Sequence, residues 1–242
     1  MAKSGEQRPS RHFLQSLRCH VLSPPTTALK TVRRERDEIQ AERRAFESFA
    51  DRVADVPCDA PAPDVPTIMV DSESGAIERV RTAYRETVMD TDHYADVYDN
   101  TLRADIASEF GKGVAAALCS DTPVQFTDRL QQFLLAAVEE SITERETVLD
   151  RLDDEEASLT AAKDELVDLV DNLDGTQIPQ WYATTFTERL DRLAADRQDK
   201  IRSHRSLGRL DGHSLCEHLY AEEPWTYPVL TAIGRVREAV VL

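Results

Sequence analysis

The chain has 242 residues, of which 41% are hydrophobic, so it can form one large domain or two small ones around a modest core. Eight Gly, eleven Pro and 6% aromatic residues do not fit a sandwich, a barrel or a doubly wound sheet, and no stretch alternates like a β-strand. The net charge of −16 argues against nucleic acid as the main partner, because phosphate contacts require clustered cations.

The kinds of charged residue carry a second signal. The bases are 24 Arg against 5 Lys, and the acids are 24 Asp against 21 Glu. This composition is typical of proteins that work in molar salt, where the screening length is about 3 Å and dense like charge no longer opposes folding. We interpret the source as a halophile; the alternative is an ordinary acidic helical protein.

Cysteines and apolar runs predict where the protein works. Cys19, Cys58, Cys119 and Cys216 are spread along the chain without a close pair, which fits reduced thiols better than a disulfide framework. The N-terminus lacks the apolar run of a signal peptide, and the longest apolar runs are too short to cross a bilayer. These observations predict a cytoplasmic protein without a membrane span.

Residues 1–26 are predicted to form a weakly ordered basic N-terminal arm, which ends at Pro24 and Pro25. Residues 1–36 hold eight Lys or Arg against two Glu, so the arm could touch nucleic acid or anionic lipid, although solvated arms are more common. An N-terminal helix is predicted over residues 27–56. Its apolar stripe is narrow, so this helix should lie lengthwise against another element.

Residues 57–75 are predicted to be a Pro-rich linker, because four prolines between Pro57 and Pro66 prevent a helix there. This segment is the best candidate for a domain boundary. A helical domain is predicted over residues 76–242. Its first helix should start near Ala76, break near Asp90 and bend or end at Gly111.

The most informative stretch runs from Gln125 to Leu173, with no Gly or Pro inside it. Its apolar residues recur at alternating steps of four and three, with a mean period of 3.5, as in a helix that packs lengthwise on another. Of the eleven stripe positions, eight are apolar and three are charged. In chain order they are Val138, Ile142, Arg145, Leu149, Leu152, Glu156, Leu159, Lys163, Leu166, Val170 and Leu173. The acidic run from Asp153 to Glu156 is interpreted as a solvated face.

A second helix over residues 178–207 is the preferred companion for this stripe. Gly175 suits the residue after a helix end, and Pro179 suits the first turn of the next helix, so the chain should turn back there. A long antiparallel coiled-coil hairpin is therefore predicted over about residues 125–207, followed by a docked C-terminal helix. The fold class is all-α, an elongated helical bundle.

Two segments carry a resemblance to a known family. The stretch from Tyr84 to Tyr94, continuing through Glu109-Phe-Gly111, and the late stretch Trp225-Thr-Tyr-Pro-Val-Leu230 resemble an all-helical haloarchaeal family described as a domain of unknown function. The resemblance covers most of residues 27–242. It implies a helical fold and a salt-adapted cytosol, and it supplies no activity and no residue roles.

One dense group of His and Cys is a candidate metal site. In the stretch from His213 to His218, the residues His213, Cys216 and Glu217 would share one face of a helix and could hold a zinc ion. Zinc sites usually combine matched ligand pairs, which are missing here. The favoured interpretation is a short, partly buried helix, and no metal or cofactor is expected.

A second group, Asp92, His93, Tyr94, Tyr98 and Asp99, could transfer protons, since an Asp can orient an imidazole. Adjacent helical residues diverge by about 100°, however, so Asp92 and His93 should not touch, whereas Tyr94 and Tyr98 share a face as interface aromatics. Neither a Gly-rich phosphate loop nor a nucleophile elbow is present. We expect no catalytic residues.

These patterns lead to two hypotheses about function. The first is a non-enzymatic helical scaffold or protein-interaction protein of a halophile cytoplasm, with an unidentified protein or a second copy of the chain as partner. The second is a small-molecule or metal-binding regulatory protein that uses residues His213 to His218.

Overall fold

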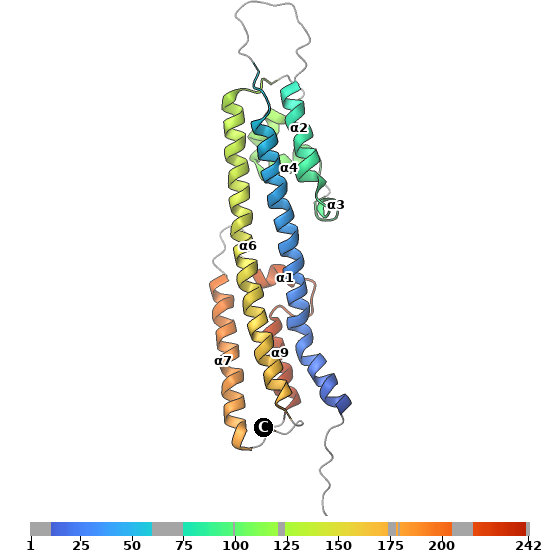
Figure 1. Cartoon of the computed structure of the whole chain (residues 1–242), viewed down its shortest axis with the longest axis vertical. Coiled ribbons are helices and arrows are strands. Elements are labelled where there is room, and N and C mark those ends of the chain that lie inside the picture. Colours follow the sequence, from blue (N-terminus) through green and yellow to red (C-terminus); the bar gives the residue numbers. More distant parts are fainter. Residues whose placement is uncertain are drawn as a thin grey trace, which may run out of the picture. The chain divides into compact units, whose positions relative to one another are not determined.

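Every regular element that the structure describes is a helix, which confirms the predicted all-α helical bundle. The computed structural model describes residues 11–59, 75–98, 100–120, 124–173, 178, 180–204 and 215–240. Figure 1 shows the elements in chain order. They are α1 (Arg11–Ala54), α2 (Gly75–Thr87), the 3-10 helix η1 (Val88–Asp90), α3 (Tyr94–Val97), α4 (Leu102–Glu109), α5 (Gly111–Leu118), α6 (Asp128–Asp171), α7 (Gln180–His204), α8 (Leu215–Leu219) and α9 (Pro228–Ala239).

The chain divides into two compact units. Unit 1 comprises residues 1–36 and 151–242, and unit 2 comprises residues 37–150. The division falls within α1 and α6, so each of these 44-residue helices contributes to both units. The sequence placed its boundary at the Pro-rich segment instead, because prolines mark the end of a helix. A long amphipathic helix can supply one side to two successive cores without any such mark.

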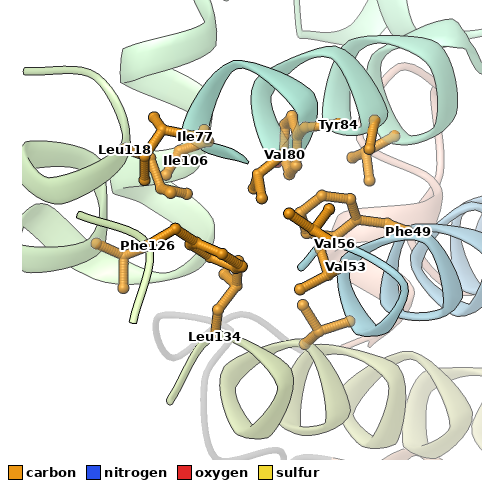
Figure 2. Close-up of a cluster of buried hydrophobic side chains, with 14 of the residues drawn as sticks. Phe49, Val53, Val56, Ile77, Val80, Tyr84, Ile106, Leu118, Phe126 and Leu134 are labelled. Carbon is orange, nitrogen blue, oxygen red and sulfur yellow. The ribbon is translucent and has the colours of Figure 1, made fainter. Parts of the chain in front are cut away.

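The core of unit 2 is formed by α1, α2, α4, α5 and α6 (Figure 2). Phe49 is fully buried in this core, with its ring centroid 5.1 Å from that of Tyr84 and 6.2 Å from that of Phe110. The Tyr84 contact is edge-to-face, an arrangement that aromatic rings prefer in protein cores. The same core contains further buried side chains from these helices and from the residues that flank α1 and α6: Val53, Val56, Ile77, Val80, Ile106, Leu118, Phe126 and Leu134.

The C-terminal end of α1 is held by α6. The side-chain amide of Gln131 donates to the carbonyl oxygen of Val53 at 2.9 Å, in the last turn of α1, and to that of Val56 at 3.1 Å, just beyond the helix. The chain then pairs with the segment before α6, since the backbone N–H of Asp59 donates to Phe126 O and the Phe126 N–H donates to the Asp59 carboxylate. Of the predicted linker over 57–75, residues 60–74 lie outside the described residues.

The predicted bend at Gly111 is present. Helix α4 ends at Glu109 and α5 begins at Gly111, whose φ angle is +86°. That left-handed conformation is strained for residues with a Cβ atom, so glycine allows the direct passage from α4 to α5. The predicted break near Asp90 is also present, as the 3-10 helix and the turn that follow α2.

In unit 1, α1 and α6 run antiparallel. Arg18 near the start of α1 pairs with Asp171 at the end of α6 at 2.5 Å, and Arg33 pairs with Glu156 at 2.6 Å. Exposed pairs of this kind contribute at most about 1 kcal/mol each, so they fix the register of the two helices more than their stability. Helix α1 is therefore a companion of α6 that the prediction left out.

The predicted companion, α7, also lies antiparallel beside α6 (Figure 1). Arg189 of α7 contacts both Glu165 and Asp168 at 2.7 Å, and Arg197, eight residues later, contacts Glu155. Seven of the eight apolar stripe positions are buried, and Leu149 is partly buried. The turn residues Gly175 and Pro179 lie outside the described residues.

The prediction of a weakly ordered arm is wrong for residues 11–26. Helix α1 begins at Arg11 and includes Pro24 and Pro25. A proline inside a helix costs about 3 kcal/mol, because it removes a hydrogen bond and crowds the preceding turn. Both prolines are buried here together with Leu17 and Val21, so apolar burial in unit 1 offsets this cost.

A side chain from α9 replaces one hydrogen bond that the prolines remove. In a regular helix the N–H of residue 24 would donate to the carbonyl oxygen of His20, but Pro24 has no N–H. The Nη1 atom of Arg235 lies 2.6 Å from that oxygen and donates to it. Arg235 thus supports α1 at the turn that its sequence weakens.

We expect Arg235→Met to lower the free energy of unfolding by about 1 kcal/mol, the usual worth of one hydrogen bond. The matched background is Pro24→Ala. It restores the missing N–H of residue 24, which can then donate to the carbonyl oxygen of His20 within the helix. In the Pro24→Ala background, Arg235→Met should lower the free energy of unfolding by less than half of the amount lost in the wild-type background. Urea unfolding of the four proteins measures both costs, and equal costs in the two backgrounds would contradict the role assigned to Arg235.

Candidate functional site

Charged residues interrupt the apolar stripe of α6, and they mark where polar contacts cross between helices. In unit 1, Glu156 accepts hydrogen bonds from Arg33 at 2.6 Å and from Arg36 at 3.0 Å, both on α1. In unit 2 the interruption is Arg145, whose side chain is only 14% exposed. Because a buried charge needs partners, Arg145 is the natural starting point for a search for a site.

Arg145 is the centre of five side chains that we name the Glu42 cluster: Glu42, His93, Tyr98, Glu109 and Arg145. The Nε atom of Arg145 donates to Glu42 Oε2 at 2.9 Å, and its Nη1 atom donates to Glu109 Oε1 at 2.7 Å. One guanidinium group thereby joins α6 to α1 and α4. A planar fork of donors allows two carboxylates to be held at once.

The second oxygen of Glu42 binds the segment that follows α2. His93 Nε2 lies 3.1 Å from Glu42 Oε1, and the Tyr98 hydroxyl donates to the same oxygen at 2.9 Å. An ionised carboxylate only accepts hydrogen bonds, so Nε2 of His93 carries a proton in this contact. Glu42 therefore has partners on both of its oxygens.

Burial shapes the electrostatics of the Glu42 cluster. Desolvation, followed by the charge of Glu42, raises the pKa of Tyr98 well above its ordinary value. Burial alone would lower the pKa of Arg145, but its hydrogen bonds to Glu109 and Glu42 outweigh that effect and raise it. The guanidinium carbon also lies 4.1 Å from the centroid of the Phe46 ring, a cation–π contact.

A small cavity of about 60 Å³ adjoins the Glu42 cluster, lined also by Tyr84 and Asp105. The Tyr84 hydroxyl donates to Asp105 Oδ2 at 2.6 Å, and both residues are buried. Desolvation and the Asp105 charge raise the pKa of Tyr84 strongly. Tyr84 and Tyr98 thus stay protonated near neutral pH, where they donate hydrogen bonds and are poorly suited to exchange protons.

A second cluster lies in unit 1 and is more deeply buried; we name it the Glu155 cluster: Glu155, Ser158, Arg197, Cys216 and Tyr220. The side chains of Arg197 and Glu155 are 1% and 0% exposed, and Arg197 holds the two carboxylate oxygens at 2.5 and 2.8 Å. Ser158 accepts from Arg197 at 3.1 Å, and the Tyr220 hydroxyl donates to Glu155 at 3.1 Å. The Glu155 cluster therefore ties α7 and α8 to α6.

The buried environment keeps these groups in fixed charge states. Burial, together with the charge of Glu155, raises the pKa of Cys216 to about 11 and raises that of Tyr220 further from its ordinary value. The hydrogen bond and charge of Glu155 outweigh desolvation and raise the pKa of Arg197. Cys216 is therefore a protonated thiol near neutral pH, a form that binds metal weakly and reacts slowly.

The structure separates the residues of the hypothetical zinc site. Cys216 is buried against Arg197, whereas Glu217 is exposed and His218 lies at the surface, 3.7 Å from Glu35. His213 lies outside the described residues. Within the described ranges, no group of three or more His, Cys, Asp or Glu residues could hold a metal ion.

The second predicted group is only partly assembled. Asp92 is exposed and His93 turns to Glu42, while the rings of Tyr94 and Tyr98 lie 5.5 Å apart. Asp99 lies outside the described residues. Sequence reasoning missed Glu42 as the shared acceptor, although the charged residue at stripe position 145 pointed to a carboxylate on a neighbouring helix.

None of the helices in the described ranges combines the length and the apolarity needed to cross a bilayer. Comparisons found no matching curated protein and no matching solved structure. A family model described as a domain of unknown function, DUF7260, matches residues 24–241, which is most of the chain and includes both clusters. The chain therefore belongs to the DUF7260 family, a domain of unknown function.

Proposed function

We propose that this protein is a non-enzymatic helical scaffold that binds another protein, and that Trp181 on α7 is an anchor of the contact. Trp181 is 82% exposed, the highest value for a large hydrophobic side chain in the part of the chain that the structure describes. Trp is costly to leave in water and is enriched among the residues that dominate binding energy. This exposed ring is the observation that carries the proposal.

The surroundings of Trp181 support an anchor held in place. Its ring centroid lies 5.6 Å from that of Tyr182, which lies 6.1 Å from that of the buried Phe186. Arg189 donates to the Tyr182 hydroxyl at 3.3 Å. The row of rings leads from the surface to the buried Phe186, so Trp181 has an aromatic neighbour to pack against on its own helix.

The two buried clusters favour a structural over a catalytic role. Their tyrosines and Cys216 have pKa values raised away from neutral pH, and their carboxylates are held by arginines. An acid or base that works near neutral pH needs a pKa close to it. We further propose the cytoplasm of a halophile as the site of action, supported by the net charge of −16 and the excess of Arg over Lys.

The test is a photo-crosslinking amino acid at position 181, used in cell extract of the source organism at molar KCl. The matched control carries it at Arg202, also on α7 and 63% exposed. We expect a discrete adduct from position 181 and none from position 202. Excess unlabelled wild-type protein should reduce the yield of this adduct, and excess Trp181→Ser protein should leave the yield unchanged.

The mass of the adduct separates the possible partners. Twice the mass of the chain identifies a second copy, and light scattering of the purified protein should then give a dimer that Trp181→Ser dissociates. Another mass identifies a different protein. Equal labelling at positions 181 and 202, or none at either, would overturn the proposal.

A further inference from the structure

The acidity of the chain is concentrated in unit 2. Residues 37–150 carry 25 acidic against 10 basic residues, a net charge of −15, whereas the rest of the chain has 20 acidic against 19 basic residues. A strongly charged region draws partners of the opposite charge and speeds their association.

Within unit 2, the outer side of α6 combines this charge with an exposed ring. Phe133 is 59% exposed, while its neighbour Leu134 is fully buried in the core. Steps of three and four place Ala136, Glu140, Thr143 and Thr147 on the same side as Phe133, and all of them are exposed. We name these five residues the Phe133 face.

The threonines make this face less polar than its sequence implies. The Thr143 hydroxyl donates to the carbonyl oxygen of Glu139 at 2.9 Å, and the Thr147 hydroxyl donates to that of Thr143 at 3.0 Å. Because each hydroxyl is bonded to its own helix, the methyl groups are left for contact. These methyl groups and Ala136 are small, so a second helix can approach the helix backbone closely beside the larger side chain of Phe133.

The charge at the edge of the Phe133 face selects the partner. Glu139, Glu140 and Asp150 are exposed on this part of α6, and one base, Arg129, is exposed one turn before Phe133. The other base of α6 in unit 2 is Arg145. Arg145 is turned into the Glu42 cluster, so it does not offset the acids outside. A second copy would bring the same acidic surface against this one and would offer these acids no cation to pair with.

We propose that the Phe133 face binds a basic amphipathic helix of a partner protein, with Phe133 inserted among apolar side chains and Lys or Arg paired with the acids at its edge. This inference deepens the proposed scaffold function and names the chemistry of a partner. It depends on unit 2 alone, whereas the Trp181 contact lies in unit 1.

The test measures binding of a fluorescent Lys/Leu amphipathic helical peptide of roughly five turns to the full chain by anisotropy. A Glu/Leu peptide of the same length is the matched probe. We expect the basic peptide to bind and the acidic one to fail. Phe133→Ser should weaken binding of the basic peptide about tenfold or more, the loss typical of a binding hot spot.

Two variants distinguish binding at the Phe133 face from non-specific electrostatic binding to an acidic protein. Glu140→Lys changes the charge on the Phe133 face, and Asp51→Lys makes the same change at an exposed position of α1 in unit 2. Glu140→Lys should weaken binding several-fold more than Asp51→Lys. Equal effects, or an unchanged affinity of Phe133→Ser, would overturn the proposal.

Trp181→Ser provides the comparison with the scaffold function. It should leave binding of the basic peptide unchanged, because Trp181 belongs to unit 1. If Trp181 crosslinks a partner while Phe133→Ser has no effect, the scaffold function stands and the basic-helix proposal fails. If Phe133→Ser abolishes peptide binding while position 181 gives no adduct, the basic-helix proposal stands and the proposed contact at Trp181 fails.

Discussion

Arg197→Met should lower the free energy of unfolding by about 3–5 kcal/mol, because it leaves the Glu155 carboxylate buried without its cation. Arg197 and Glu155 are 1% and 0% exposed, so solvent cannot take the place of the lost guanidinium. The variant also removes the donors to Ser158 and Cys216. Denaturant unfolding measured by Trp fluorescence gives the cost, since both tryptophans, Trp181 and Trp225, lie in unit 1.

Two further variants show whether burial causes the effect. Arg202 also contacts a carboxylate at 2.5 Å, that of Asp199, but their side chains are 63% and 73% exposed. Arg202→Met should therefore change the free energy of unfolding by at most about 1 kcal/mol. The double variant Glu155→Leu with Arg197→Met should recover much of the loss, because no charge is then left in the core. A cost for Arg197→Met no larger than for Arg202→Met would be incompatible with the geometry.

The long helix was predictable because its pattern repeats many times. Its apolar stripe gave the helix over 125–173, close to the observed Asp128–Asp171, and the stripe also located the buried side. The stripe includes one charged position in unit 2, Arg145, which the structure shows in polar contact with α1 and α4. What the pattern could not identify was the partner, since Glu42 is 103 residues away in sequence and no local rule joins the two.

Two misjudged segments show why local rules fail. The run from Asp153 to Glu156 was interpreted as a solvated face, which holds for Asp153 and Asp154, both exposed. Glu155 is instead fully buried, because Arg197 from α7 supplies a compensating charge that the sequence of α6 does not contain. Pro24 and Pro25 were interpreted as the end of a weakly ordered arm, but they lie inside α1, where tertiary burial and the side chain of Arg235 maintain the helix.

The Glu42 cluster differs from the Glu155 cluster in how much water reaches it. The side chains of Glu42, His93, Arg145 and Glu109 are 10–23% exposed, and Tyr98 is 40% exposed. One cation serves two carboxylates, so the geometry of the guanidinium matters as much as its charge. The two clusters therefore allow a buried arginine and a partly exposed one to be compared within one protein. In unit 2 we therefore expect the shape of the guanidinium to contribute to stability in addition to its charge.

Arg145→Met should lower the free energy of unfolding by about 2–4 kcal/mol, somewhat less than Arg197→Met because solvent reaches part of the cluster. The variant leaves Glu42 and Glu109 without their shared cation and removes the contact with Phe46. Far-UV circular dichroism during denaturant unfolding measures the change, since unit 2 contains no Trp. Arg52→Met is the control: its pair with Glu86 is exposed, so the variant should cost at most about 1 kcal/mol.

Arg145→Lys then separates charge from geometry. A lysine keeps the positive charge, but its single ammonium group cannot reproduce the fork that holds Glu42 Oε2 and Glu109 Oε1 at 2.9 and 2.7 Å. We expect Arg145→Lys to lose about half as much stability as Arg145→Met. If lysine preserved the wild-type stability, the charge alone would hold α1, α4 and α6 together, and the guanidinium geometry would play no part in the assembly of unit 2.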